Sequence, residues 1–211
     1  MPAKKRPAAN PWPARTKRRS ADFDGKRIAI MDAATRLFRD HGYKGASLNE
    51  LARLLNVTKP TIYYYFSSKD EILRSIKHHT LDEVIRMLVE VRATELRGID
   101  KLTEAMRRYV HILASDYGRV VVLIHDRVLT KKSQVAIRDR TAVIDNHLFA
   151  IYDQAIAEGD LRRIERHVLH YTLFGALNWT PNWYDPEGRI PPEKLADLQV
   201  TMLVDGVRTS S

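Results

Sequence analysis

The stretch 47–69 constrains this chain more than any other, because it predicts two short helices joined by a tight turn. Thr58 is a suitable N-cap for the second helix, and Pro60 falls in its first turn, where a missing N–H costs nothing. That helix is predicted to end near Phe66. This is the pattern of a helix-turn-helix, in which the first helix braces the second in the major groove of DNA. The first helix has leucines on one face, at Leu48, Leu51, Leu54 and Leu55.

The second helix of this motif carries side chains that suit a nucleic acid. A lysine donates to guanine O6 and N7, and the carbon surface of threonine or proline suits a thymine methyl group. Tyrosine hydroxyls and a lysine at a helix start suit phosphate oxygens. Ser47, followed by Glu50, forms a capping box that marks the start of the first helix, where a phosphate can also be bound. The candidate contacts on and after the second helix are Lys59, Pro60, Thr61, Tyr63, Tyr64, Tyr65 and Lys69.

The net charge of +9 is concentrated at the N-terminal end of the chain. Residues 1–70 contain 15 lysines and arginines against 6 aspartates and glutamates, a difference of +9, whereas the other 20 basic and 20 acidic residues cancel. A basic module beside a neutral one is typical of a protein that binds a polyanion at one end. A merely solubilising basic surface is the alternative.

Residues 1–24 are rich in proline, alanine and basic residues, and we expect them to be a disordered arm. Two interpretations stay open for this arm. It either tracks phosphates or enters a minor groove, as basic arms do elsewhere, or it is a solubilising tail with a diffuse effect on affinity.

The rest of the chain shows helical spacing of apolar residues and no sustained strand alternation, so we expect an all-α fold. Besides the motif, helices are predicted at 26–40, 69–92, 101–115, 120–129, 133–158, from 162 or 165 to 179, and from 191 or 192 onward. We expect a DNA-binding domain over 25–70 and a helical effector-binding and dimerisation domain over 71–211. The inward faces are predicted to hold Ile28, Met31, Ala34, Leu37 and Phe38, then Leu73, Ile76, Val84, Leu88 and Val91, and finally Leu195, Leu198, Met202 and Leu203.

The compartment is indicated by what the sequence lacks. There is no cysteine, so disulfides and thiolate metal sites are excluded. No apolar run approaches the roughly 20 residues that span a bilayer. The basic N-terminus is not followed by the apolar segment of a secretory signal. We expect a cytoplasmic protein associated with the nucleoid.

The motif also carries a family resemblance. Residues 26–73 resemble the N-terminal domain of TetR-family transcriptional regulators. Asn56 stands where the family usually has glycine, and asparagine tolerates the left-handed conformation that such a turn requires. The matching residues include His41-Gly42-Tyr43, Ser47-Leu48, Leu51-Ala52, the run Thr58-Lys59-Pro60-Thr61-Ile62-Tyr63-Tyr64-Tyr65-Phe66, then Ser68-Lys69 and Leu73.

The resemblance implies a homodimer that binds a palindromic operator, usually as a repressor. It also implies a C-terminal helical domain that holds a small effector and forms the dimer through its last two helices. Carried over by position, Lys59, Pro60, Thr61 and Tyr63 would lie nearest the bases, whereas Tyr64, Tyr65 and Lys69 would hold phosphates.

The segment 174–188 resembles a variant found in TetR-type regulators of fatty-acid and sterol catabolism, several of which sense acyl-CoA thioesters. In one interpretation, its aromatic residues pack a four-helix dimer interface. In the other, the domain also binds an acyl-CoA effector. Arg162 and Arg163 would then pair with CoA phosphates, and Trp179 or Trp183 would cover the adenine. Asn178 is a further candidate effector contact. The acyl tail would enter a tunnel lined by Leu113, Val122, Leu123, Ile124 and Phe149.

A metal site and an enzyme are both disfavoured by the sequence. The candidate ligands lack the paired i, i+4 spacing of a helical metal site, so we predict no metal and no cofactor. No nucleophile elbow or phosphate-cradling glycine loop is present. A ligand-independent architectural DNA-binding protein and a CoA-thioester-binding enzyme remain the alternatives to a ligand-responsive repressor. The disfavoured metal ligands are His111, His125, His147, Asp126 and Asp145. We expect these residues to be polar groups of a ligand pocket or satisfied buried histidines instead.

Overall fold

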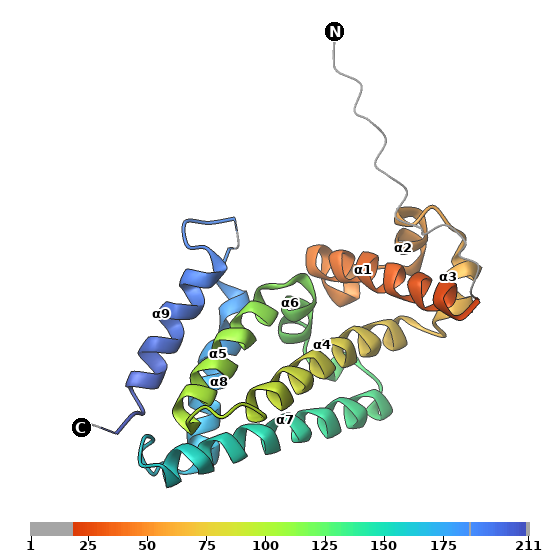
Figure 1. Cartoon of the computed structure of the whole chain (residues 1–211). Helices are drawn as coiled ribbons and strands as arrows, with labels where there is room; N and C mark the ends of the chain where they lie inside the picture. The colour runs from red at the N-terminus through yellow and green to blue at the C-terminus, as the bar shows by residue number, and fades with distance from the viewer. Residues whose placement is uncertain (1–18, 186, 210–211) are drawn as a thin grey trace. The chain divides into compact units, whose positions relative to one another are not determined.

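The computed structural model describes residues 19–185 and 187–209, and its regular elements are all helices (Figure 1). The prediction of an all-α fold is confirmed. One isolated antiparallel bridge joins Leu161 to Arg208. The elements are α1 (Arg19–Gly45), α2 (Leu48–Leu54), α3 (Lys59–Tyr65), α4 (Lys69–Arg92), α5 (Gly98–Ala114), α6 (Asp116–Leu123), η1 (Asp126–Val128), α7 (Lys131–Ala157), α8 (Arg166–Trp179), η2 (Thr180–Asn182) and α9 (Pro192–Asp205).

The chain divides into two compact units, Met1–Ser75 and Ile76–Ser211, so the division falls a few residues beyond the expected boundary at 70. Helix α4 begins in unit 1 and continues into unit 2. None of the described helices is long and apolar enough to cross a bilayer.

Unit 1 is the predicted helix-turn-helix, and its caps are the ones that the sequence indicates. Ser47 Oγ accepts a hydrogen bond from the Glu50 N–H at 3.1 Å, which begins α2. Thr58 Oγ1 accepts from the Thr61 N–H at 3.4 Å, which begins α3. Asn56 adopts a φ of 54°, the left-handed conformation expected of the turn. The core behind these helices includes Ala34, Leu37, Phe38, Leu51, Leu55, Ile62 and Phe66.

Three expectations for unit 1 are wrong. Helix α1 begins at Arg19, so residues 19–24 are helical, whereas the arm over 1–18 lies outside the described residues. Phe23 explains this early start, because its ring packs 5.0 Å from that of Tyr65. Ile28 and Leu54, predicted to face inward, are half exposed.

In unit 2, α5 is the central helix, and it packs against α6, α7, α8 and α9. The predicted inward face of α4 is confirmed, because the five residues predicted for it, from Leu73 to Val91, are all buried. The predicted inward face of α9 is only partly correct. Its buried residues repeat at a spacing of four as Ala196, Val200 and Val204, and this leaves Leu198 and Met202 exposed on the other side.

The predicted helix over 120–129 is also wrong. Ser115 Oγ accepts from the Gly118 N–H at 3.0 Å and begins α6 earlier, at Asp116. The helix then ends at Leu123, and the chain forms the short η1. Helix α8 begins at Arg166, because the carboxylate of Glu165 accepts from the Val168 N–H at 2.8 Å.

Candidate nucleic-acid interface and ligand cavity

Helix α3 presents one polar, solvent-exposed face. Ile62 is buried and Phe66, at the C-cap, is buried too, whereas Tyr63 and Tyr64 between them face outward. Tyr63 is 48% and Tyr64 73% exposed. Lys59 and Pro60 are exposed at the start of the helix, where the Lys59 ammonium lies 5.9 Å from the centre of the Tyr63 ring. The structure therefore brings together most of the side chains predicted to contact DNA.

Tyr65 differs from its two neighbours because it faces α1. Its ring packs on Phe23, and its carbonyl accepts a hydrogen bond from the Arg27 guanidinium. The same guanidinium lies 3.9 Å from the centre of the Phe66 ring. Tyr65 is thus placed to fix α3 against α1, and this pairing across 38 residues has no local signal in the sequence.

Lys69 has a position that the sequence did not indicate. Its ammonium donates to the carbonyl oxygens of Tyr43, at 2.7 Å, and Ala46, at 2.9 Å. Burial lowers the pKa of Lys69. These bonds hold the turn immediately before the Ser47 cap. A phosphate contact by Lys69 stays a prediction, and two of its three N–H groups are already used.

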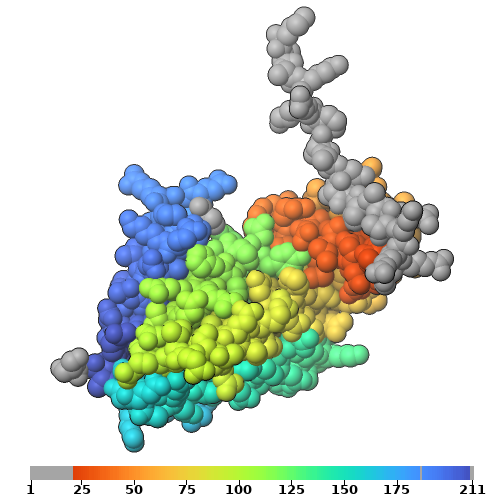
Figure 2. Space-filling model, in the orientation of Figure 1, coloured from red at the N-terminus to blue at the C-terminus, as the bar shows by residue number. Residues whose placement is uncertain are grey.

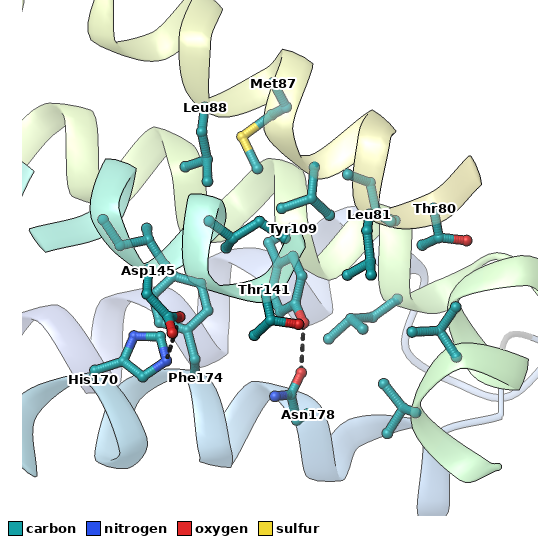
Figure 3. A pocket seen from close by; sticks show the side chains of 17 residues that line it. Thr80, Leu81, Met87, Leu88, Tyr109, Thr141, Asp145, His170, Phe174 and Asn178 are labelled. Carbon is teal, nitrogen blue, oxygen red and sulfur yellow. Dashed lines mark hydrogen bonds and ion pairs between the residues drawn. The ribbon is translucent and has the colours of Figure 1, made fainter. Parts of the chain in front are cut away.

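Unit 2 contains a cavity of about 340 Å³ whose lining is mainly apolar (Figure 3). This volume lies within the range of about 300–1,000 Å³ found for small-molecule sites. Of the predicted effector contacts, Leu113, Val122 and Asn178 line it. The complete lining is Thr80, Leu81, Val84, Met87, Leu88, Tyr109, Ile112, Leu113, Val121, Val122, Thr141, Ile144, Asp145, Leu148, His170, Phe174 and Asn178.

The other predicted effector contacts do not line the cavity. Phe149 instead packs against the rings of His167 and His170. Leu123 is exposed and Ile124 is buried elsewhere. Helical spacing places a residue on a face, but it does not say which neighbouring helix that face meets.

The predicted CoA-phosphate and adenine contacts are also away from this cavity. Arg162 and Arg163 are exposed in the connection before α8, where the Arg162 N–H donates to the carbonyl of Val207 at 3.1 Å. Trp179 is 65% and Trp183 54% exposed on the outer surface. The cavity and these four side chains do not form one site within the chain.

The cavity contains two polar pairs whose pairing the sequence did not indicate. Tyr109 Oη donates to Asn178 Oδ1 at 2.6 Å, and Asp145 Oδ1 lies 3.5 Å from His170 Nε2. Burial raises the pKa of Tyr109 and of Asp145. Burial also lowers the pKa of His170, although the Asp145 charge opposes this effect. The spacing of four between His170, Phe174 and Asn178 could have revealed this face of α8.

A buried lysine joins α4 to the wall of the cavity. Lys77 is 2% exposed, and its ammonium donates to the carbonyls of Val121, at 2.8 Å, and Ile124, at 2.7 Å. The carboxylate of Asp126 lies 2.7 Å from the same ammonium. Since Val121 lines the cavity, Lys77 connects that wall directly to α4.

Apolar side chains are exposed along the outer sides of α8 and α9. On α8 they occur at Val168, Tyr171 and Trp179, with Gly175 exposed among them. On α9 they occur at Leu198 and at Met202, which is 77% exposed. Figure 2 shows α9, in dark blue, uncovered along the edge of unit 2. We call these residues of α8 and α9 the outer apolar face. Contiguous exposed apolar residues mark interaction surfaces.

Comparison with known families gives two matches that together cover most of the chain. Residues 30–76 match the model described as bacterial regulatory proteins, tetR family. Residues 95–207, more than half of the chain, match the model described as tetracyclin repressor-like, C-terminal domain. Both descriptions are of regulators and neither is of an enzyme.

Individual relatives agree with these matches. The fatty acid metabolism regulator protein of Bacillus subtilis (strain 168) is 22% identical in an alignment of 188 residues that covers 86% of this chain and 95% of the relative. The structure of AibR in complex with isovaleryl coenzyme A and operator DNA is 26% identical, with a TM-score of 0.76 over 84% of this chain and 97% of AibR. The ketosteroid transcriptional regulator KstR2 of Mycobacterium tuberculosis has a TM-score of 0.80 at 15% identity, over 87% of this chain and 95% of KstR2.

Proposed function

Because this chain belongs to the TetR family of transcriptional regulators, we propose that it is a repressor whose homodimer binds a palindromic operator and is released by a small effector. The exposed polar face of α3 carries this proposal. Two such helices, about one DNA turn or roughly 34–36 Å apart, would enter successive major grooves. We also propose that the protein acts in the cytoplasm, at the nucleoid.

Within this proposal, the α3 side chains have separate roles. Lys59, Pro60, Thr61 and Tyr63 contact bases, and Tyr64 contacts a phosphate. Ser47 brings the start of α2 to a second phosphate. Tyr65 and Lys69 support the interface mainly indirectly. Tyr65 orients α3 through its contact with α1, and Lys69 orients Ser47 through its bonds to the turn before α2.

Replacing Lys59 with alanine is expected to weaken operator binding by about 1–3 kcal/mol and to relax the preference at the contacted base pair. The operator is first selected from a random duplex library with the wild-type protein. Affinity is then measured by fluorescence anisotropy at fixed salt, on the selected duplex and on a scrambled one. Lys132→Ala removes the same charge from an exposed site on α7 and is the matched control. Equal affinities for wild type and Lys59→Ala would contradict the role of α3.

We propose that the dimer forms through the outer apolar face of α8 and α9. Gly175 supports close helix approach, because a Cβ at this position would meet no other segment of the described chain within 4 Å. Large exposed aromatics beside small residues suit the core of a homodimer interface. The exposed Trp179 and Met202 then become buried in the assembly.

The variant Trp179→Asp is expected to be largely monomeric at concentrations where the wild type is a dimer, because dimerisation would bury an unpaired charge. Sedimentation velocity measures this directly. Val135→Asp, at a similarly exposed apolar site on α7, is the control and should remain dimeric. If Trp179→Asp stays dimeric, with the same dimer dissociation constant as the wild type, the interface lies elsewhere.

We propose that the effector is an acyl-CoA thioester whose acyl part occupies the cavity of unit 2. The apolar lining and the volume support this, as does the binding of isovaleryl coenzyme A by the relative AibR. Native mass spectrometry of the purified protein identifies ligands that are already bound. Adding each of them to the protein–operator complex then tests release. A ligand-independent architectural protein would carry no ligand and would show no release.

A further inference from the structure

We propose that the cavity of unit 2 selects effectors that carry a hydrogen-bonding oxygen at the far end of their apolar body, in preference to plain hydrocarbon chains. The inference rests on the proposed effector function. It comes from the two polar pairs of the cavity, which lie at separate places along α8 (Figure 3). His170 and Asn178 are eight residues apart, which is about 12 Å along a helix. Phe174 lies between them, and the rest of the wall is mainly apolar.

In the pair at Asn178, the amide NH2 group of Asn178 can donate a hydrogen bond to a ligand. Asn178 Oδ1 accepts from Tyr109, and across the described part of the chain its amide nitrogen makes no hydrogen bond. The two threonine hydroxyls of the lining are already used, because Thr80 donates to the Ile76 carbonyl at 3.3 Å and Thr141 to the Ile137 carbonyl at 3.2 Å. An amide N–H pairs with a carbonyl oxygen. This place therefore suits the carbonyl of an acyl thioester.

The pair at His170 lacks hydrogen-bond partners. The 3.5 Å between Asp145 and His170 is longer than the usual 2.7–3.2 Å of an N–H···O bond. His170 Nδ1 is buried without a partner within residues 19–185 and 187–209. The same holds for the hydroxyl of Tyr152, whose pKa is raised by burial and by the Asp145 charge. The imidazole is held in place because its ring stacks on Phe174, with centroids 5.4 Å apart and planes at 16°.

The chemistry of this second pair points to a hydroxyl or similar oxygen on the ligand. A hydroxyl can donate to the Asp145 carboxyl and accept from the imidazole, which satisfies groups that a hydrocarbon would cover and leave unpaired. A chain that ends in a methyl group at this place loses those bonds. The cavity is therefore arranged for a ligand with a polar atom at each end of an apolar body.

The test uses the full-length protein and matched ligands. Octanoyl-, decanoyl- and dodecanoyl-CoA are compared with their ω-hydroxy counterparts by isothermal titration calorimetry. For the chain length that spans the two pairs, we expect the hydroxylated ligand to bind about tenfold more tightly. The double variant Asp145→Leu/His170→Phe should lose this preference and bind the plain thioester at least as well as the wild type does. Asn178→Leu should weaken both ligands of a pair by the same factor.

The outcomes of this titration distinguish failure of the hydroxyl preference from failure of the proposed effector class. Equal wild-type affinities for both members of every pair would overturn this inference and leave the acyl-CoA proposal intact. A hydroxyl preference that persists in the double variant would also overturn it, because the preference would then arise elsewhere. Failure of all six thioesters to bind the wild type would overturn the proposed effector class and this inference with it. If the double variant does not fold, the inference is still tested by comparing the plain and ω-hydroxy thioesters on the wild type.

Discussion

Replacing Lys77 with methionine is expected to lower the free energy of unfolding by about 3 kcal/mol. The methionine keeps the apolar stem but removes three charge-assisted contacts, to the carbonyls of Val121 and Ile124 and to the carboxylate of Asp126. The two carbonyls close the end of α6 and would lose their donor. The half-exposed Asp126 recovers part of its hydration, which limits the loss.

Urea unfolding followed by circular dichroism measures this effect. Lys132→Met, at an exposed site on α7, is the control and should change stability by no more than about 0.5 kcal/mol. A Lys77→Met protein as stable as this control would show that the ammonium is dispensable. If it folds, the Lys77→Met dimer should also respond less to an effector, because Lys77 connects the cavity wall at Val121 to α4.

Replacing Gly98 with alanine is expected to destabilise the protein by about 3 kcal/mol or more. A Cβ on Gly98 would lie 2.3 Å from the backbone nitrogen of Ala155 and 2.6 Å from its Cα. The obstacle is backbone, so α5 and α7 would have to separate. That movement would also disturb the bond from the Gly98 N–H to the Glu158 carboxylate, which is 2.6 Å long.

The matched control for this prediction is another helical glycine. A Cβ on Gly25, within α1, would meet no other segment within 4 Å among the residues that the structure describes. Gly25→Ala is therefore expected to be neutral or to stabilise the protein by up to about 1 kcal/mol, through helix propensity. Thermal unfolding of both variants shows the contrast. Similar melting temperatures for Gly98→Ala and the wild type would contradict the close approach of α5 and α7.

The parts of this structure that were predictable from the sequence are those set by local interactions. The caps at Ser47 and Thr58 act over three residues, so helices α2 and α3 could be predicted from the sequence. The roles of Lys69 and Lys77 could not. Their bonds reach carbonyls 23 to 47 residues away, and a carbonyl group gives no signal in the residue type that carries it.

The cavity was predictable only in part, for a related reason. Of the predicted effector contacts, Leu113, Val122 and Asn178 line the cavity and Phe149 does not, because periodicity alone cannot say which helix a face meets. Trp179 was a candidate for both the dimer interface and the effector. Its exposure separates it from the cavity and favours the interface. Asp145 was considered as a metal ligand and as a polar group of a ligand pocket. Its pairing with His170 was not predictable, because His170 lies 25 positions later, on another helix.

The central claim is that occupation of the cavity in unit 2 lowers the affinity of the dimer for its operator. The most direct test is fluorescence anisotropy of the labelled, selected operator with the full-length protein, with and without a saturating acyl-CoA that calorimetry has shown to bind. We expect the dissociation constant to rise by about 5- to 150-fold, which corresponds to a coupling free energy of about 1–3 kcal/mol. An unchanged dissociation constant, with the thioester bound at one molecule per chain, would contradict the claim.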